Sequence, residues 1–312
     1  MATDYILFVH GVKTRQKDEF TRLAQLLFQN IQRSLGTSRT LKPIFFFWGD
    51  LNQDAQKELL GGFQKSPKWN EFWFRDFRDT QLLEFMGDAA LYLSRHVGSQ
   101  VVRRFRDQAL ATLKGAQEDD RLHFVTHSFG TVILFDILFA GRWDDPALDE
   151  TPSTEGIRKI VFDIRNALFG LGDNPGSGVP IASIHTMGSP ISLFSLLSVT
   201  DVGQGGSSHD LSPTLKDLLE RLYNLKKKQL PWRNFAHPGD PIAYPLEGVM
   251  PLLLDENVKY VDIADLITDK GNIFNKPFQQ RLIPILWGGE AHGSYWENQL
   301  VSGAIADIIR QS

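Results

Sequence analysis

The chain contains no cysteine among its 312 residues. Disulfides, thiolate catalysis and cysteine-ligated zinc or iron–sulfur centres are therefore excluded. A large excess of charge of either sign is also missing, because the 33 Lys and Arg residues nearly balance the 37 Asp and Glu residues. The formal net charge is −4. That balance gives no bulk electrostatic reason to expect a nucleic-acid partner. Hydrophobic residues make up 42% and charged residues 22%, which is typical of a globular protein and excludes a disordered chain.

Long hydrophobic runs are absent as well. No stretch reaches the roughly 18 uninterrupted apolar residues of a membrane-spanning helix. The first residues lead directly into the apolar run 5–9, without a basic segment or a small-residue cleavage site, so no secretory signal peptide is expected. We therefore expect a cytoplasmic protein and treat membrane contact as the less favoured alternative.

Short apolar runs alternate with longer helical patterns along the chain. Several runs are apolar at consecutive positions, which is typical of strands covered on both faces. Alternation of strands and helices predicts an α/β fold with a mainly parallel sheet and right-handed crossovers. The strands are expected at residues 5–9, 43–48, 122–126, 181–186, 232–236 and 258–263.

Three segments interrupt this rhythm within what we expect to be one domain, residues 1–312. Residues 51–114 form a long helical insertion, a candidate lid or cap, and residues 143–179 form a second insertion. Residues 201–213 are predicted to be a mobile loop from their Gly and Ser content. Aromatic residues gather in the first insertion, and we select Trp73 as a substrate contact in an acyl-pocket wall. The alternative is that these rings pack the insertion onto the sheet.

The segment Thr126-His127-Ser128-Phe129-Gly130 lies between an apolar strand and an apolar helix. A serine on a sharp strand-to-helix turn is exposed for attack and sits at the positive end of the helix. The residues two before and two after it must be small, because the backbones approach closely there. Gly130 meets that condition, whereas Thr126 departs from the commoner glycine. We interpret Ser128 as the nucleophile and His127 as a packing or hydrogen-bonding residue.

The first expected strand ends in His10-Gly11-Val12. Because neighbouring parallel strands end at the same sheet edge, the loop that follows can direct a backbone N–H toward Ser128. We predict an oxyanion hole formed by the N–H groups of Val12 and Phe129. His10 and Gly11 are expected to border the bound substrate.

A serine hydroxyl is a weak nucleophile unless a base accepts its proton. Of the histidines that follow Ser128, His185 lies within an expected strand and His209 within the Gly/Ser-rich loop. His237 and His292 remain as candidates. We assign His292 as the base, because its late loop leads into the last helix and can reach over the strand ends.

The base needs an acid that orients it. We assign Asp240, which follows the fifth expected strand in a Pro- and Gly-containing turn. Asp262 and Asp265 are the first alternatives, and Asp136 is a more distant one. A Gly-Ser-Pro turn that contains Ser189 follows another expected strand and is predicted to shape the substrate pocket.

Together these motifs resemble the α/β-hydrolase superfamily, and are most similar to its lipase- or serine-esterase-like branch. In that branch a His-Ser-x-Gly elbow precedes a Gly-Ser-Pro turn and a Gly-Asp-Pro acid loop. The resemblance implies about six mostly parallel strands flanked by helices, and ester hydrolysis through an acyl-enzyme. Two departures are expected: the early antiparallel strands common in the family should be missing, and the 51–114 insertion replaces a short crossover.

The predicted function is therefore a serine hydrolase that cleaves a small-molecule or lipid-like carboxylic ester with Ser128, Asp240 and His292. Amidase, thioesterase and acyltransferase chemistry would use the same residues and stay open. A non-catalytic hydrolase-fold binding module is the alternative from another class. The sequence has no H-E-x-x-H motif, EF-hand loop or Walker loop, so neither a metal nor a cofactor is expected.

Overall fold

The computed structural model describes residues 2–36, 39–51, 53–117, 119–168, 178–194, 213–269 and 290–312. The loop predicted at 201–213 lies outside these ranges except for its last residue, and so does part of the second insertion, 169–177. Within the described ranges, no helix is both long enough and apolar enough to cross a bilayer.

Six strands form one sheet, and every neighbouring pair in it is parallel. The order across the sheet is β2-β1-β3-β4-β5-β6. The strands are β1 (Thr3–Val9), β2 (Thr40–Phe46), β3 (Arg121–His127), β4 (Ile181–Met187), β5 (Leu230–Ala236) and β6 (Val261–Ile267). The strand order reverses between β1 and β3, which creates a switch point where the chain after β1 and the chain after β3 lead to helices on opposite faces of the sheet. The parallel sheet with flanking helices confirms the predicted α/β fold.

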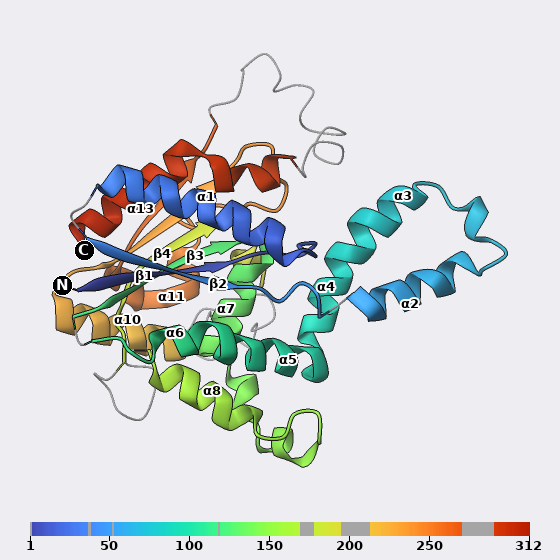
Figure 1. Cartoon of the computed structure of the whole chain (residues 1–312), viewed down its shortest axis with the longest axis horizontal. Coiled ribbons are helices and arrows are strands. Elements are labelled where there is room, and N and C mark those ends of the chain that lie inside the picture. Colours follow the sequence, from blue (N-terminus) through green and yellow to red (C-terminus); the bar gives the residue numbers. More distant parts are fainter. Residues whose placement is uncertain are drawn as a thin grey trace.

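The central strands are buried on both faces, which explains their unbroken apolar character. Successive residues of β1 point to opposite faces, so Leu7 and Val9 join one core and Ile6 and Phe8 join the other. Helices α1 (Lys17–Leu35) and α13 (Gln299–Gln311) cover the face of the sheet to which Phe8 points (Figure 1).

The opposite face carries most of the remaining helices (Figure 1). They include α5 (Arg95–Phe105), α7 (Phe129–Phe139), α8 (Ile157–Asn166), α10 (Pro213–Lys226) and α11 (Met250–Leu254). Shorter elements are η3 (Arg106–Leu110), α6 (Ala111–Leu113), η4 (Gly141–Trp143), η5 (Pro146–Glu150), α9 (Ile191–Phe194), η7 (Asp255–Tyr260) and η9 (Ser294–Glu297).

Part of the chain between β2 and β3 leaves the body as a projecting arm (Figure 1). We define the arm as residues 53–93. It contains α2 (Gln53–Gln64), η1 (Trp69–Glu71), α3 (Arg75–Phe77), η2 (Arg78–Leu83) and α4 (Glu84–Leu93). The chain then returns along the sheet through α5, whose apolar face is buried in the core. Helices therefore occupy the predicted insertion, but only its first part projects.

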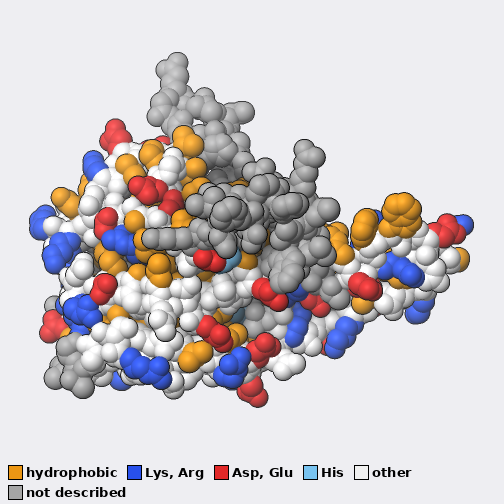
Figure 2. Space-filling view, turned by 90° about the horizontal axis from the view of Figure 1, so that it is seen from above, with side chains coloured by type: hydrophobic (Ala, Val, Ile, Leu, Met, Phe, Trp, Pro, Cys, Tyr) orange, Lys and Arg blue, Asp and Glu red, His pale blue; other side chains and the backbone are white. Residues whose placement is uncertain are grey.

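Hydrophobic side chains are exposed along this arm (Figure 2). Trp73 is 80% exposed and Phe74 is 75% exposed. The alternative in which these rings pack the insertion onto the sheet is therefore wrong for these two residues. The segment between α2 and α3 that contains them lies at the far end of the arm (Figure 1).

Several predicted boundaries shift by a few residues. The strand expected at 258–263 starts at Val261, because 255–260 forms the 3₁₀ turn η7. The last helix, into which the loop of His292 leads, starts at Gln299. Asn298 caps it by accepting hydrogen bonds from the backbone N–H groups of Leu300 and Val301.

Candidate active site

Ser128 occupies the turn between β3 and α7, at the switch point of the sheet. Its φ of 55° and ψ of −134° are strained for a residue with a side chain. The turn is held by a 2.9 Å hydrogen bond from the Ser128 N–H to the carbonyl of Met187. Among the described residues, the buried Ser128 Oγ has no hydrogen-bond partner. The predicted strand–turn–helix geometry is thus present at this serine, whereas its side chain is buried and not exposed as expected.

The two small positions of the turn are satisfied in different ways. A Cβ on Gly130 would lie 2.3 Å from the carbonyl oxygen of His10, so only glycine fits. Thr126 is accommodated because its hydroxyl shares a 2.8 Å hydrogen bond with that of Thr131 on α7. The β-branched side chain therefore ties the strand to the helix instead of obstructing the turn.

Gly11 lies directly against the serine. A Cβ at this position would lie 2.4 Å from Ser128 Cβ and 2.9 Å from Ser128 Oγ. A side chain here would occupy the space next to the hydroxyl. The backbone after β1 therefore approaches Ser128 as closely as the sequence predicts.

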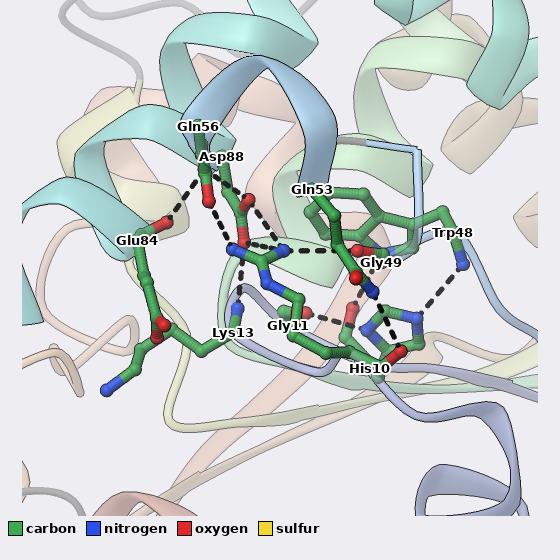
Figure 3. Close-up of polar contacts among 10 residues, drawn as sticks. His10, Gly11, Lys13, Trp48, Gly49, Gln53, Gln56, Glu84 and Asp88 are labelled. Atoms are coloured by element: carbon green, nitrogen blue, oxygen red, sulfur yellow. Dashed lines mark hydrogen bonds and ion pairs between the residues drawn. The ribbon is translucent and has the colours of Figure 1, made fainter. Parts of the chain in front are cut away.

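His10 supports this loop from beneath (Figure 3). Its ring is 1% exposed and stacks on the Trp48 indole at 5.3 Å. The backbone N–H of Trp48 donates to His10 Nε2 at 3.0 Å, so Nδ1 carries the proton and donates to the Gly11 carbonyl at 2.7 Å. Burial lowers the pKa of His10 to about 3, which keeps the ring neutral. The buried ring shapes the loop and has almost no surface for the substrate contact that we expected.

The same hydrogen bond orients the next peptide. The Gly11 carbonyl faces the His10 ring, and in a trans peptide the N–H of Val12 points to the opposite side. The N–H of Val12, one of the two predicted oxyanion donors, is therefore directed away from His10. Phe129, the other predicted donor, is the first residue of α7.

Asp240 and His292 form a hydrogen-bonded pair. His292 Nδ1 donates to Asp240 Oδ2 at 2.9 Å, and the Asp240 side chain is fully buried. Asp240 also accepts hydrogen bonds from the Tyr295 hydroxyl at 2.7 Å and from the Ile242 N–H at 2.9 Å. Burial by itself would raise the pKa of Asp240, but His292, Tyr295 and the Ile242 N–H together hold it below the ordinary value. The carboxylate stays ionised and accepts from His292 Nδ1, which orients the ring as a general base requires.

His127 and Tyr295 support the pair from two sides. The His127 ring lies 4.5 Å from the His292 ring, and its Nε2 donates to the His292 carbonyl at 2.6 Å. Burial and the neighbouring His292 lower the pKa of His127 to about 3. The Tyr295 hydroxyl accepts from the His237 N–H at 2.8 Å, and burial and the Asp240 charge raise its pKa. The hydrogen-bonding role expected for His127 is thus observed, whereas Tyr295 was not predicted.

Gly188 packs against the same pair. Its φ is +55°, and a Cβ there would lie 2.6 Å from Asp240 Oδ2 and 3.1 Å from His292 Nδ1. The sequence predicted that the Gly-Ser-Pro turn lies near the site, but it did not predict the contact of Gly188 with Asp240 and His292. Ser189 is buried and its Oγ accepts from the Ile191 N–H at 3.2 Å. Its predicted role in shaping the substrate pocket stays a prediction.

The alternative acids bond to other groups. Asp262 pairs with Arg233 at 2.6 Å, and Asp136 pairs with Arg142 at 2.7 Å. Asp265 accepts from two backbone N–H groups and from an asparagine side chain. Among the described residues, none of these contacts involves a histidine.

The side chains of the remaining candidates make other contacts. His237 Nδ1 accepts from the Gly239 N–H at 3.0 Å, so it is engaged in the turn that precedes Asp240. Trp73 lies in the far part of the arm, where most of its surface faces solvent. Its predicted contact with substrate stays a prediction.

The parallel sheet, its switch point and the strand–Ser128–helix turn have the architecture of the α/β-hydrolase superfamily, as the motifs predicted.

Comparison with protein-family profiles gives no match. Over 179 residues the chain is 26% identical to a probable mitochondrial phospholipase of Saccharomyces cerevisiae. The matched region covers 55% of this chain and 19% of that protein. The chain thus spans well under two thirds of that relative. Among solved structures, an acetyl xylan esterase aligns with 10% sequence identity and a TM-score of 0.27. The alignment covers 97% of this chain and 98% of the esterase chain. That likeness is too low to support an argument.

Proposed function

We propose that the protein hydrolyses carboxylic esters through an acyl-enzyme formed on Ser128. The observation that carries this proposal is the buried Asp240–His292 hydrogen bond beside the strained serine turn. His127, the neighbour of Ser128 in the chain, bonds to the His292 backbone and so ties the pair to the turn. A binding module would not require a nucleophile, a base and an acid in such an arrangement.

The proposed reaction has two halves. Ser128 Oγ attacks the ester carbonyl while His292 Nε2 takes its proton, and the N–H groups of Val12 and Phe129 stabilise the oxyanion. The imidazolium then protonates the leaving alcohol, and the acyl group remains on Ser128. Water, deprotonated by His292, attacks the acyl-enzyme. The bond between the acyl carbon and Ser128 Oγ then breaks, the imidazolium returns its proton to Oγ, and the acid is released. Asp240 fixes the His292 tautomer and stabilises the imidazolium without accepting its proton.

A lipid-like ester is the substrate class that we favour. The sequence similarity to a probable phospholipase supports an ester of that type over an amide or thioester. No cofactor or metal takes part in the proposed steps. The proposal places the chain with the lipase- or serine-esterase-like hydrolases.

A fluorophosphonate probe tests the nucleophile. We expect labelling of the wild type and of Ser99→Ala, a control at another buried serine whose hydroxyl donates to a carbonyl in α5. Labelling should disappear in Ser128→Ala. Equal labelling of Ser128→Ala and wild type would refute the nucleophile assignment.

Ester turnover tests the acid, with p-nitrophenyl esters of increasing chain length and a phospholipid as substrates. Asp240→Asn should lower kcat by about 10⁴-fold, because the amide favours the wrong His292 tautomer. Asp265→Asn should retain kcat in its folded fraction. Loss of kcat in Asp265→Asn together with an unchanged kcat in Asp240→Asn would assign the acid role to Asp265.

A further inference from the structure

A buried carboxylate joins the arm to the loop after β1. Asp88 lies on α4 and its side chain is fully buried. It accepts hydrogen bonds from the Lys13 backbone N–H at 2.8 Å, from Arg15 at 3.0 Å and from the Gln56 amide at 2.8 Å (Figure 3). A buried carboxylate costs several kcal/mol unless such partners compensate it. We call these four residues the Asp88 clamp.

The clamp brings four segments together. Arg15 donates to the Gly49 carbonyl in the loop after β2 at 3.1 Å, and to Gln56 Oε1 on α2 at 2.7 Å. Gln56 also donates to Asp88 on α4, so α2 and α4 of the arm are both bound to the loop after β1. A Cβ on Gly49 would lie 1.7 Å from the carbonyl oxygen of Thr14, which shows how closely the two loops pack.

The clamp acts on the residue next to a predicted oxyanion donor. Lys13 has a φ of +64°, a left-handed conformation that is costly for a side chain of this kind. Asp88 holds its N–H, and therefore the Val12–Lys13 peptide. His10 holds the Gly11–Val12 peptide through the Gly11 carbonyl. Both peptides that flank Val12 are thus fixed by buried side chains.

We propose that Asp88 is a positioning residue for ester hydrolysis, which preorganises the Val12 N–H as an oxyanion donor with the help of Arg15 and Gln56. This inference rests on the proposed function. An oxyanion donor contributes because its direction is set before charge develops on the substrate. Loss of the clamp should therefore weaken binding of the transition state more than binding of the ground state.

The test compares two fully buried carboxylates that each pair with a partly buried arginine. Asp88→Asn keeps the shape but loses the charge that holds Lys13 and Arg15. Asp4→Asn is the matched control, because Asp4 pairs with Arg39 near the start of β1, at the opposite end of the strand. Both carboxylates are 0% exposed, and their arginine partners are 20% and 19% exposed.

We expect Asp88→Asn to lower kcat by about 10- to 100-fold with KM changed less than about twofold, because a misdirected donor costs less than a deleted one. Asp4→Asn should retain kcat in the folded protein. Gln56→Met, a milder change on α2, should lower kcat in the same direction and covers the case in which Asp88→Asn does not fold.

Hydrogen exchange gives a readout that does not depend on activity. Exchange of amides in residues 11–15 should accelerate in Asp88→Asn and not in Asp4→Asn. Faster exchange with an unchanged kcat, or equal loss of kcat in both variants, would overturn the positioning role. A wild type that neither reacts with the fluorophosphonate nor hydrolyses esters would instead overturn the proposed function, and with it the catalytic meaning of the clamp.

Discussion

At residue 188 a single methyl group is predicted to disturb the acid–base pair. Gly188 adopts φ +55°, and a Cβ would meet Asp240 Oδ2 at 2.6 Å and Tyr295 at 2.8 Å. Since both neighbours are buried, neither can move away without cost. We expect Gly188→Ala to lower the free energy of unfolding by about 1–3 kcal/mol and kcat by about tenfold or more. Urea denaturation and ester turnover measure the two effects.

Gly36 offers a matched control for this substitution. It has φ +69°, but a Cβ there would have no heavy atom within 4 Å. Gly36→Ala should therefore cost only the backbone strain of about 1–2 kcal/mol and leave kcat unchanged. If Gly188→Ala also retained full kcat, crowding at the Asp240–His292 pair would have no catalytic consequence.

Individual site residues were predictable where local sequence carries the signal. Ser128 was found from the strand–turn–helix pattern, and Asp240 from the turn after a strand. The contacts of Gly188 and Tyr295 with Asp240 could not be predicted, because they join segments more than 50 positions apart and depend on the final packing. Their catalytic roles, like those of the proposed triad, stay predictions.

At the scale of elements, strands were easier to locate than the arm. The central strands are buried on both faces, so each appears in the sequence as an unbroken apolar run. The arm gave no such signal, because aromatic residues at helical spacing fit a packed surface and a projecting one equally well. Its direction depends on polar anchors at its base, such as Asp88 and Gln56, which do not form a sequence motif.

The exposed aromatic residues of the arm should contribute little to folding. The double variant Trp73→Ser/Phe74→Ser removes side chains that are largely in solvent, so the free energy of unfolding should change by less than about 0.5 kcal/mol. Trp143→Ala, at a buried tryptophan, should cost about 3–5 kcal/mol. Denaturant midpoints compare the variants, and a large loss in the double variant would show that these rings do pack. A rise in KM for long acyl chains alone would support the predicted substrate contact of Trp73.

At the scale of the whole molecule, the sheet encloses several histidines that cannot readily ionise. His10, His123, His127 and His185 are buried, and burial is the largest cause that lowers the pKa of each. The pKa falls to about 3 for His10 and His127. In the unfolded chain these side chains have a pKa of about 6.5. The unfolded state therefore binds more protons than the folded state once the pH drops below that value.

Stability should consequently fall as the pH is lowered from about 6.5 toward 4, because proton uptake favours the unfolded chain. Each neutral buried histidine contributes a slope of up to about 1.4 kcal/mol per pH unit, so several of them produce a steep loss. Asp4 and Asp240, whose pKa values lie below the ordinary value, add their loss only at still lower pH. Urea denaturation at pH 7.5, 6.0 and 5.0 measures the slope.

His185→Gln isolates the contribution of one ring. His185 Nε2 lies 2.8 Å from Ser183 Oγ, and glutamine can replace that hydrogen bond without a titrating group. The variant should lose up to about 1.4 kcal/mol per pH unit from the slope below pH 6.5, whatever its stability at pH 7.5. An unchanged slope would mean that His185 takes up its proton in the folded protein. In that case the acid sensitivity above pH 5 would have to arise from the other buried histidines, His10, His123 and His127.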